Sequence, residues 1–327
     1  MPKEITHWTL AEKAYQSIEP DSVLKKIIRQ YKNLYLAGAV IADTPFYQVC
    51  GRNRKIMYQL GKNLHDHPLN SYAPLANVIK RYSSPLPEDV LAILLGFLAH
   101  IHADSSFHPM VYYFSGTNMH GPKKSRNEAS VFHHTLEAYI DIYYTGECRL
   151  PNRGLFSELM KRKEMEETRF LKVLSVLFSE NQTISVSDIR EMLRLHAGIQ
   201  KLFDNNAIKI ILKLLDSIPG TDLKVYRSSF YPLRKPEPDS IFLRPFSYRH
   251  PVTGEKLEHT VKELERKAVR ETLNIFRLIE YHLTDNSLDR AFPELRGPNL
   301  TTGLTDIRAA DMLWFGTGED LMKLIFH

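Results

Sequence analysis

Residues 94–109 read LLGFLAHIHADSSFHP, and this segment gives the clearest structural signal in a chain of 327 residues. It begins as a wholly apolar run and continues into histidines and an aspartate. An α-helix turns about every 3.6 residues, so His100 and Asp104 are expected one above the other on one face. His108 continues that line until Pro109 interrupts the helix. The segment therefore predicts a buried helix with three side chains of metal-ligand type along one stripe.

The same spacing returns in residues 133–141, HHTLEAYID, where His133, Glu137 and Asp141 follow one another at intervals of four. In helical bundles, histidines and carboxylates that project inward from facing helices hold metal ions. A single pair of this kind is more often a surface ion pair or a satisfied buried imidazole. His100 and Asp104, however, follow helical turns that are almost wholly apolar. A carboxylate buried there requires a partner such as a cation.

Histidines crowd the first part of the chain, where nine of the fourteen lie within residues 1–134. Outside the two segments above, this group includes His7, His65 and His67. The second part holds isolated histidines such as His196, for which a surface or core role is the simpler interpretation. The candidate chemistry is therefore concentrated in the first half.

Apolar residues recur at intervals of three and four through most of the chain, which predicts an all-α protein. The expected helical segments are Val23–Tyr35, Leu75–Tyr82, Pro87–His102, Ala129–Tyr144, Leu155–Leu177, Ser187–Leu202, Asn206–Ser217 and Leu257–Leu283. We expect a multi-helix bundle over residues 1–150, with metal ligands projecting from facing helices. Residues 151–327 are expected to form a helical extension with a proline-rich loop, packed separately or as one domain with the first.

Composition excludes several protein classes. With 43% apolar and 25% charged residues, the chain is neither disordered nor a membrane bundle. The excess of 43 Lys and Arg over 38 Asp and Glu is small, so the charge favours phosphate-bearing partners only mildly. Two cysteines support neither a disulfide framework nor a thiolate metal site. The longest apolar run, Val90–Ala99, is about half of a membrane span and predicts a core helix. Without a secretory signal, a cytoplasmic location is expected.

Five separated pieces give residues 1–145 a resemblance to a known family. They are Thr6-His7, AGAVIADTP at 37–45, LHDH at 64–67, GFLAH-x3-D-x3-HP at 96–109 and His133-x3-Glu137. In this order the pieces resemble the zinc-dependent phospholipase C family. That family is related to bacterial phospholipases C, fungal single-strand nucleases and the N-terminal part of glycosylphosphatidylinositol-specific phospholipase D.

The resemblance implies roles for the first pieces. His7 corresponds to an early histidine ligand, and Asp43 to the aspartate that binds metal or activates water. The next histidine ligand corresponds to His65, with His67 as the alternative. In classical secreted members a processed N-terminal tryptophan binds zinc, whereas His7 here follows six residues. One metal could therefore be missing or differently ligated.

The resemblance also implies roles for the helical stripes. His100 corresponds to a histidine ligand and Asp104 to an aspartate that bridges two metals, while His108, His133 and Glu137 correspond to the ligands of a further metal. The step from Asp104 to His108 is shorter than in the best-known secreted enzymes. Asp141 could replace or support a ligand. These residues are equally consistent with a site of two metal ions and with a site of three.

The chemistry implied is hydrolysis of a phosphoric diester by metal-activated water. Asp43 is the candidate for orienting or deprotonating that water. Histidine and carboxylate ligands without thiolate suit zinc best, with manganese or iron as alternatives. The loop before the second stripe places Lys123, Lys124 and Arg126 where a phosphate could approach, although a solvated connector is an equal interpretation.

The sequence leaves three functions open. Phospholipase C-like cleavage is favoured, and it would require peripheral contact with a membrane. Nuclease-like cleavage is favoured less, because the positive charge is modest. A structural metal in a non-catalytic interaction protein is the third possibility. Residues 151–327 could cap the site, form a dimer face or shape substrate entry, and the oligomeric state is open.

Overall fold

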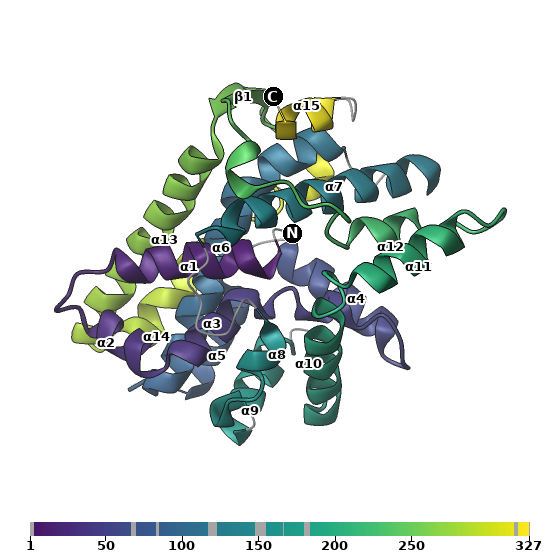
Figure 1. The fold of residues 1–327 in the computed structure, drawn as a ribbon. Helices are drawn as coiled ribbons and strands as arrows, with labels where there is room; N and C mark the ends of the chain where they lie inside the picture. Colours follow the sequence, from purple (N-terminus) through teal and green to yellow (C-terminus); the bar gives the residue numbers. More distant parts are fainter. Residues whose placement is uncertain are drawn as a thin grey trace.

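Helices dominate the computed structural model of the chain (Figure 1), which describes residues 3–66, 70–82, 85–116, 123–147, 155–165, 167–179, 184–316 and 320–326. The helices of the first half are α1 (Glu4–Gln16), α2 (Val23–Gln30), α3 (Lys32–Ile41), η1 (Thr44–Tyr47), α4 (Arg54–His65), α5 (Ala73–Tyr82), α6 (Glu88–Ser115) and α7 (Lys123–Thr145). The predicted all-α class is confirmed.

The second half is also mainly helical. Its elements are α8 (Phe156–Leu159), η2 (Lys163–Met165), α9 (Thr168–Leu177), α10 (Val186–Gln200), α11 (Asn206–Asp216), α12 (Lys224–Ser228), η3 (Pro238–Ser240), β1 (Phe246–Arg249), β2 (Lys256–His259), α13 (Val261–Thr284), α14 (Leu288–Ala291), η4 (Phe292–Glu294), η5 (Ala309–Asp311) and α15 (Asp320–Phe326). The antiparallel pair β1–β2 is the one sheet within the described residues.

Helix α6 runs through the centre of the molecule, with α1, α3, α7 and α13 packed around it (Figure 1). Its first part belongs to one apolar cluster, which ends along the helix at Ile101. Its second part belongs to another cluster, which begins at Ala103. The stripe that contains His100 and Asp104 therefore lies where the two clusters meet, and it is surrounded by apolar packing on both sides.

Two glycines allow α3 and α6 to approach closely. A Cβ atom on Gly96 would lie 2.0 Å from the carbonyl oxygen of Tyr35, and one on Gly38 would lie 2.2 Å from that of Ile93. Such contacts are far inside van der Waals distance, so any side chain at either position would push the helices apart. The close approach places Ala39 beside His100.

The predicted interruption at Pro109 is wrong, since α6 continues to Ser115. Pro109 has no N–H to donate to the carbonyl of Ser105, which removes one helical hydrogen bond. The side chains of Phe107, Met110 and Val111 around it are completely buried. Their packing holds this turn in the helix despite the missing bond.

Other boundaries also differ from the prediction. Helices α1 and α4 were not predicted, and the segment 23–35 divides at Tyr31 into α2 and α3. The segment 257–283 begins inside strand β2, and the connection between β1 and β2 is a turn with Gly254 at a φ of 72°. Short elements of this kind carry little periodicity of their own.

The two halves of the chain share both apolar clusters. Phe156 and Ile275 pack in the same cluster as Leu24 and Ile101. The boundary predicted at residue 150 stays a prediction. Within the described residues, α6 is long and apolar enough to cross a membrane, but its apolar window is completely buried inside the molecule, which is equally typical of a core helix.

Candidate metal centre

Four candidate ligands from three elements converge beside α6. Asp43 follows α3, His65 is the last residue of α4, and His100 and Asp104 lie one turn apart on α6. One ligand atom from each of the four lies within 4.8 Å of all the others. Nε2 of His65 lies 3.0 Å from Oδ1 of Asp43, and Nε2 of His100 lies 3.2 Å from Oδ2 of Asp104. We call these residues group 1.

A second group of three lies farther along α6, where it faces α7. It consists of His108, His133 and Glu137, whose ligand atoms also lie within 4.8 Å of one another. Nε2 of His133 is 2.8 Å from Oε1 of Glu137, and Nε2 of His108 is 3.9 Å from the same oxygen. We call these residues group 2.

Asp104 lies between the two groups. Its Oδ2 faces group 1, at 3.4 Å from Nε2 of His65. Its Oδ1 faces the other way, at 3.7 Å from Nε2 of His108. The two oxygens of one carboxylate thus point into different groups, which is the arrangement expected of a ligand shared by two cations.

His7 of α1 lies beside both carboxylates of group 1 but outside the group itself. Its Nε2 is 3.4 Å from Oδ1 of Asp104 and 3.6 Å from Oδ2 of Asp43, and its ring stacks on that of His100 with centroids 4.0 Å apart. The structure therefore places His7 beside the carboxylates of group 1, and its role as a ligand stays a prediction.

Backbone carbonyls fix the orientation of three imidazoles. Nδ1 of His65 lies 2.7 Å from the oxygen of Gly61, Nδ1 of His100 lies 3.0 Å from that of Ala39, and Nδ1 of His108 lies 2.7 Å from that of Leu300. A carbonyl only accepts, so each Nδ1 carries the hydrogen when the ring is neutral. Nε2 then presents its lone pair to the centre, as in metal-binding histidines.

The atoms that face the centre are left without hydrogen bonds. Both oxygens of Asp104 and Nε2 of His7, His100 and His108 are buried and have no hydrogen-bond partner among the described residues. Leaving so many buried polar atoms unsatisfied is costly. A cation bound among them would satisfy these atoms, and a set of nitrogen and oxygen donors without sulfur suits zinc.

Burial and the neighbouring charges shift the pKa values of this cluster in opposite directions. Burial lowers the pKa of His7 to about 3 and that of His108 to about 4. Burial opposes the charged form of His65 as well, but the nearby carboxylates of Asp104 and Asp43, 3.4 and 3.0 Å from its Nε2, outweigh it and raise its pKa to about 9. The histidines hold the pKa of the Asp104 carboxyl well below its usual value despite its burial. The carboxylates are therefore ionised and two of the imidazoles neutral at pH 7.

The sequence profile of the zinc-dependent phospholipase C family matches residues 6–180, more than half of the chain. The protein belongs to the zinc-dependent phospholipase C family. No curated protein and no protein of known structure matches the chain. Both ligand groups lie inside the matched range, so the family assignment and the geometry concern the same part of the molecule.

In this zinc-dependent phospholipase C family member, a segment beyond the matched range also contacts the centre. Leu300 accepts from His108, and the hydroxyl of Thr301 donates to the carbonyl of His65 at 3.1 Å. Asn299 donates to Asp66, the residue after His65, at 2.8 Å. No sequence motif pointed to these contacts, because backbone carbonyls carry no residue signature.

The remaining candidates take other positions. Asp141 does not join either group: its Oδ1 accepts from the backbone N–H of Thr6 at 2.8 Å and its Oδ2 accepts from the hydroxyl of Tyr231 at 2.8 Å. The side chain of Asp141 is also completely buried. Its carboxylate ties α7 to the turn of α1 that carries His7.

His67 and the side chain of Lys123 lie outside the described residues. Lys124 and Arg126 are exposed in the first turn of α7. At about 1.5 Å per residue, Arg126 is about 10 Å along the helix from His133. Their role in binding phosphate stays a prediction.

A buried network beside Asp43 was not predicted. His196 of α10 lies between Thr44, at 3.0 Å from its Nδ1, and Glu4, at 2.9 Å from its Nε2. Its ring is stacked between those of Tyr47 and Phe156, with centroids 3.9 and 4.1 Å away. His196 had been interpreted as a surface or core residue, and it is a core residue that joins α10 to α1 and η1.

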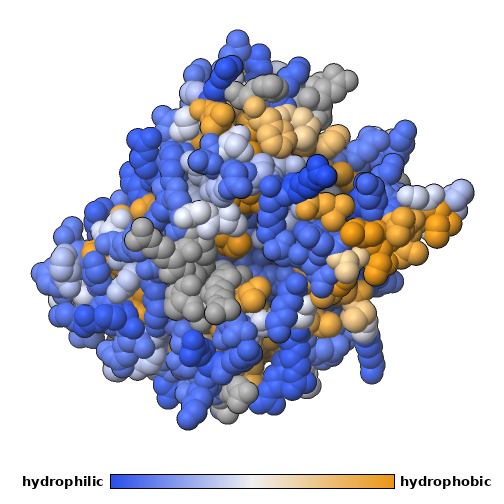
Figure 2. All heavy atoms as spheres, viewed as in Figure 1, coloured by the Kyte–Doolittle hydropathy of each residue, from blue (hydrophilic) through white to orange (hydrophobic). Residues whose placement is uncertain are grey.

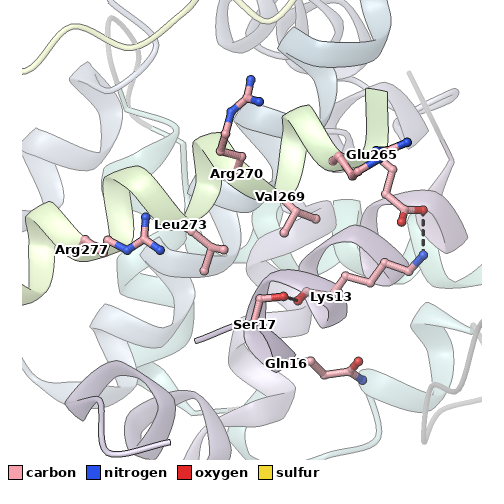
Figure 3. Close-up of a pocket in the computed structure, with 9 residues that line it drawn as sticks. Lys13, Gln16, Ser17, Glu265, Val269, Arg270, Leu273 and Arg277 are labelled. Atoms are coloured by element: carbon pink, nitrogen blue, oxygen red, sulfur yellow. Dashed lines mark hydrogen bonds and ion pairs between the residues drawn. The ribbon is translucent and has the colours of Figure 1, made fainter. Parts of the chain in front are cut away.

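A groove of about 370 Å³ lies between α1 and α13 (Figure 3). Lys13 of α1 and Glu265 of α13 form an ion pair at its edge, with Nζ 2.7 Å from Oε2. Its lining contains arginines but no histidine, and Glu265 is its only carboxylate. The groove therefore lacks a ligand set like that of groups 1 and 2, and the candidate site is the buried centre beside α6.

Proposed function

We propose that this protein is a metal-dependent phosphoric diester hydrolase with phospholipase C-like activity. The observation that carries the proposal is the position of Asp104, whose two oxygens point into two separate ligand groups. Family membership supports a hydrolytic role for zinc. We infer two or three zinc ions, held by His65, His100, Asp43 and His7 on one side, by the three residues of group 2 on the other, and by Asp104 between them.

When bound in such a site, zinc lowers the pKa of water and stabilises the developing charge on a phosphodiester. The protein's own part is to hold the donors rigid. His65, His100 and His108 are oriented by backbone carbonyls, so their Nε2 atoms need little rearrangement. Donors held in advance in this way lower the cost of forming the transition state.

Asp43 is proposed to orient the attacking water. Burial opposes the charged form of this carboxyl, but His100, His65 and His7 lower its pKa below the usual value. A carboxylate with a low pKa is a good hydrogen-bond acceptor and a weak base. Orientation is therefore the better supported of the two roles considered for Asp43.

Phospholipid is the proposed substrate class, and the formal net charge of +5 gives little support to a nucleic-acid substrate. Nuclease-like cleavage and a purely structural metal are the competing outcomes. A structural site would hold zinc without hydrolysing any diester.

The first experiment is elemental analysis of the purified protein and two variants. We expect two or more equivalents of zinc, manganese or iron in the wild type and a sharp loss in Asp104→Asn. The control is His102→Gln, because His102 is another buried histidine of α6 but its Nε2 lies 2.8 Å from the hydroxyl of Tyr72, outside both groups. Absence of metal after reconstitution with each ion would contradict the proposal.

Activity is then measured on a water-soluble phosphodiester, p-nitrophenylphosphorylcholine, on phospholipid vesicles and on single-stranded DNA. Chelation should abolish hydrolysis and zinc should restore it. Asp43→Asn should lower kcat by at least about a hundredfold, the range typical of losing the correct orientation of a reacting group. Cleavage of DNA alone would favour the nuclease, and bound metal without hydrolysis of any substrate would favour a structural role.

A further inference from the structure

Helix α11 presents an apolar face to solvent. Its sequence, NAIKIILKLLD, is amphipathic, with apolar residues at intervals of three and four. Most apolar helix faces of this kind are covered by the rest of the protein. Here the exposed fractions of Ile210, Ile211, Leu214 and Leu215 lie between 42% and 65%, and Ile218, just after the helix, is 51% exposed. Figure 2 shows the apolar surface gathered over α11 and α12, where they project from the body of the molecule.

Exposed cations accompany this apolar face. Residues 201–235 contain seven Lys and Arg against three Asp, a net charge of +4. Two of the acids are already paired, Asp204 with Lys209 and Lys235, and Asp216 with Arg227. Lys201, Lys213 and Lys224 are exposed, and none of them forms an ion pair with another described residue. The surface is therefore apolar with a positive margin.

An exposed apolar face with lysines around it favours one class of partner. An apolar helix face with lysines at its margin is typical of helices that lie in the interface of an anionic membrane. The lysines contact lipid phosphates while the apolar side chains enter the acyl boundary. A second copy of the chain is a poorer match, because two positive margins would face each other across a two-fold interface.

Helices α11 and α12 are connected to the metal centre through α7. Helix α12 packs along α7, the helix that supplies His133 and Glu137. His134, the neighbour of a candidate ligand, has its Nδ1 3.2 Å from the hydroxyls of Ser228 and Ser229 at the end of α12. A membrane bound through α11 would therefore lie at a fixed distance and orientation from group 2.

We propose that α11 and α12 dock the protein on an anionic phospholipid membrane by inserting Ile211, Leu214 and their apolar neighbours between the headgroups. The role of this docking in supplying substrate rests on the proposed phospholipase function. The docking itself does not, because it depends on residues outside the metal centre.

The test is co-sedimentation with vesicles of phosphatidylcholine, with and without phosphatidylserine. The wild type should bind the phosphatidylserine vesicles more tightly, and salt should weaken this binding. Ile211→Asn combined with Leu214→Asn should lower the partition coefficient by at least about tenfold. The matched control combines Tyr281→Asn with Leu313→Asn, which removes two exposed apolar side chains from other elements and should leave binding unchanged.

A separate probe does not depend on removing apolar residues. Leu214→Trp places an indole at a position that is 65% exposed, and its emission should shift to the blue on addition of phosphatidylserine vesicles. Absence of both the shift and wild-type co-sedimentation would overturn the docking proposal. So would a concentration-dependent dimer that the Ile211/Leu214 variant dissociates, since a second copy would then be the occupant.

Hydrolysis separates the two proposals. If both hold, the Ile211/Leu214 variant keeps full activity on p-nitrophenylphosphorylcholine and loses activity on vesicles. If the wild type binds vesicles but hydrolyses neither substrate, the proposed function fails and docking stands. If the wild type hydrolyses both substrates but the Ile211/Leu214 variant binds vesicles as well as the wild type does, docking fails and the proposed function stands.

Discussion

The imidazole of His108 donates its Nδ1 hydrogen to the carbonyl oxygen of Leu300 across a distance of 2.7 Å. The two residues are 192 positions apart, and Leu300 lies beyond the range that matches the family. A ligand of group 2 is therefore oriented by the C-terminal half of the chain. This contact gives residues 299–304 a positioning role that the sequence did not reveal.

Substitution of Asn299 should weaken that positioning. Its side chain accepts from the N–H groups of Thr301 and Thr302 and donates to Asp66. Asn299→Ala leaves these groups without partners, which should cost about 2 kcal/mol of stability and speed the loss of zinc to a chelator. Thermal unfolding and a chelator time course measure the two effects. The exposed Asn274→Ala is the control, and equal behaviour of the two variants would contradict the role assigned to Asn299.

Zinc binding should release a proton from His65 at pH 7. In the metal-free centre the pKa of this imidazole is raised to about 9 by Asp104 and Asp43, so the ring is protonated at neutral pH. A metal ligand must be deprotonated, and zinc affinity should therefore rise by about tenfold per pH unit up to about pH 9. Calorimetry in buffers of different ionisation enthalpy measures the proton. No release near pH 7 would contradict the prediction.

The raised pKa of His65 also predicts how the stability of the metal-free protein depends on pH. A histidine whose pKa is raised by folding stabilises the fold fully below its unfolded value, about 6.5, and loses this contribution as the pH rises through about 9. Chelated wild-type protein should therefore lose stability between these values. His65→Gln should show a smaller loss over the same range in urea unfolding.

The contact between α3 and α6 should not tolerate a side chain at Gly96. Gly96→Ala places a Cβ 2.0 Å from the Tyr35 carbonyl, so the helices must separate. We expect a loss of about 3 kcal/mol or more and a lower zinc content, because Ala39 moves away from His100. The control is Gly198→Ala on α10, where a Cβ has no neighbour within 4 Å. That variant should gain up to about 1 kcal/mol, since alanine favours the helix.

Asp141 should behave as a structural carboxylate. Burial raises its pKa to about 6, so the folded protein holds a proton that the unfolded chain has lost between about pH 4 and pH 6. The wild type should therefore lose stability relative to Asp141→Asn as the pH rises through this range. Asp141→Ala removes the acceptor of Thr6 and Tyr231 and should cost about 2–4 kcal/mol. Full zinc content in Asp141→Asn would agree with its position outside both groups.

The fold class and the ligand stripes followed from local periodicity. His100, Asp104 and His108 lie one turn apart on a helix wherever that helix is placed, so their shared stripe needed no knowledge of the tertiary structure. The extent of α6 did not follow in this way. Pro109 predicts an interruption locally, and only the packing of Phe107, Met110 and Val111 keeps the helix intact.

The sequence by itself determined an all-α chain with two helical stripes of histidine and carboxylate, because intervals of four residues place side chains on one helix face. The tertiary structure decided which stripes and loops meet. It placed Asp104 between two groups, brought Leu300 to His108, and removed Asp141 from the set of ligands by pairing it with Thr6 and Tyr231. These contacts join residues up to 192 positions apart, and their partners include backbone carbonyls, so no local pattern of side chains encodes them.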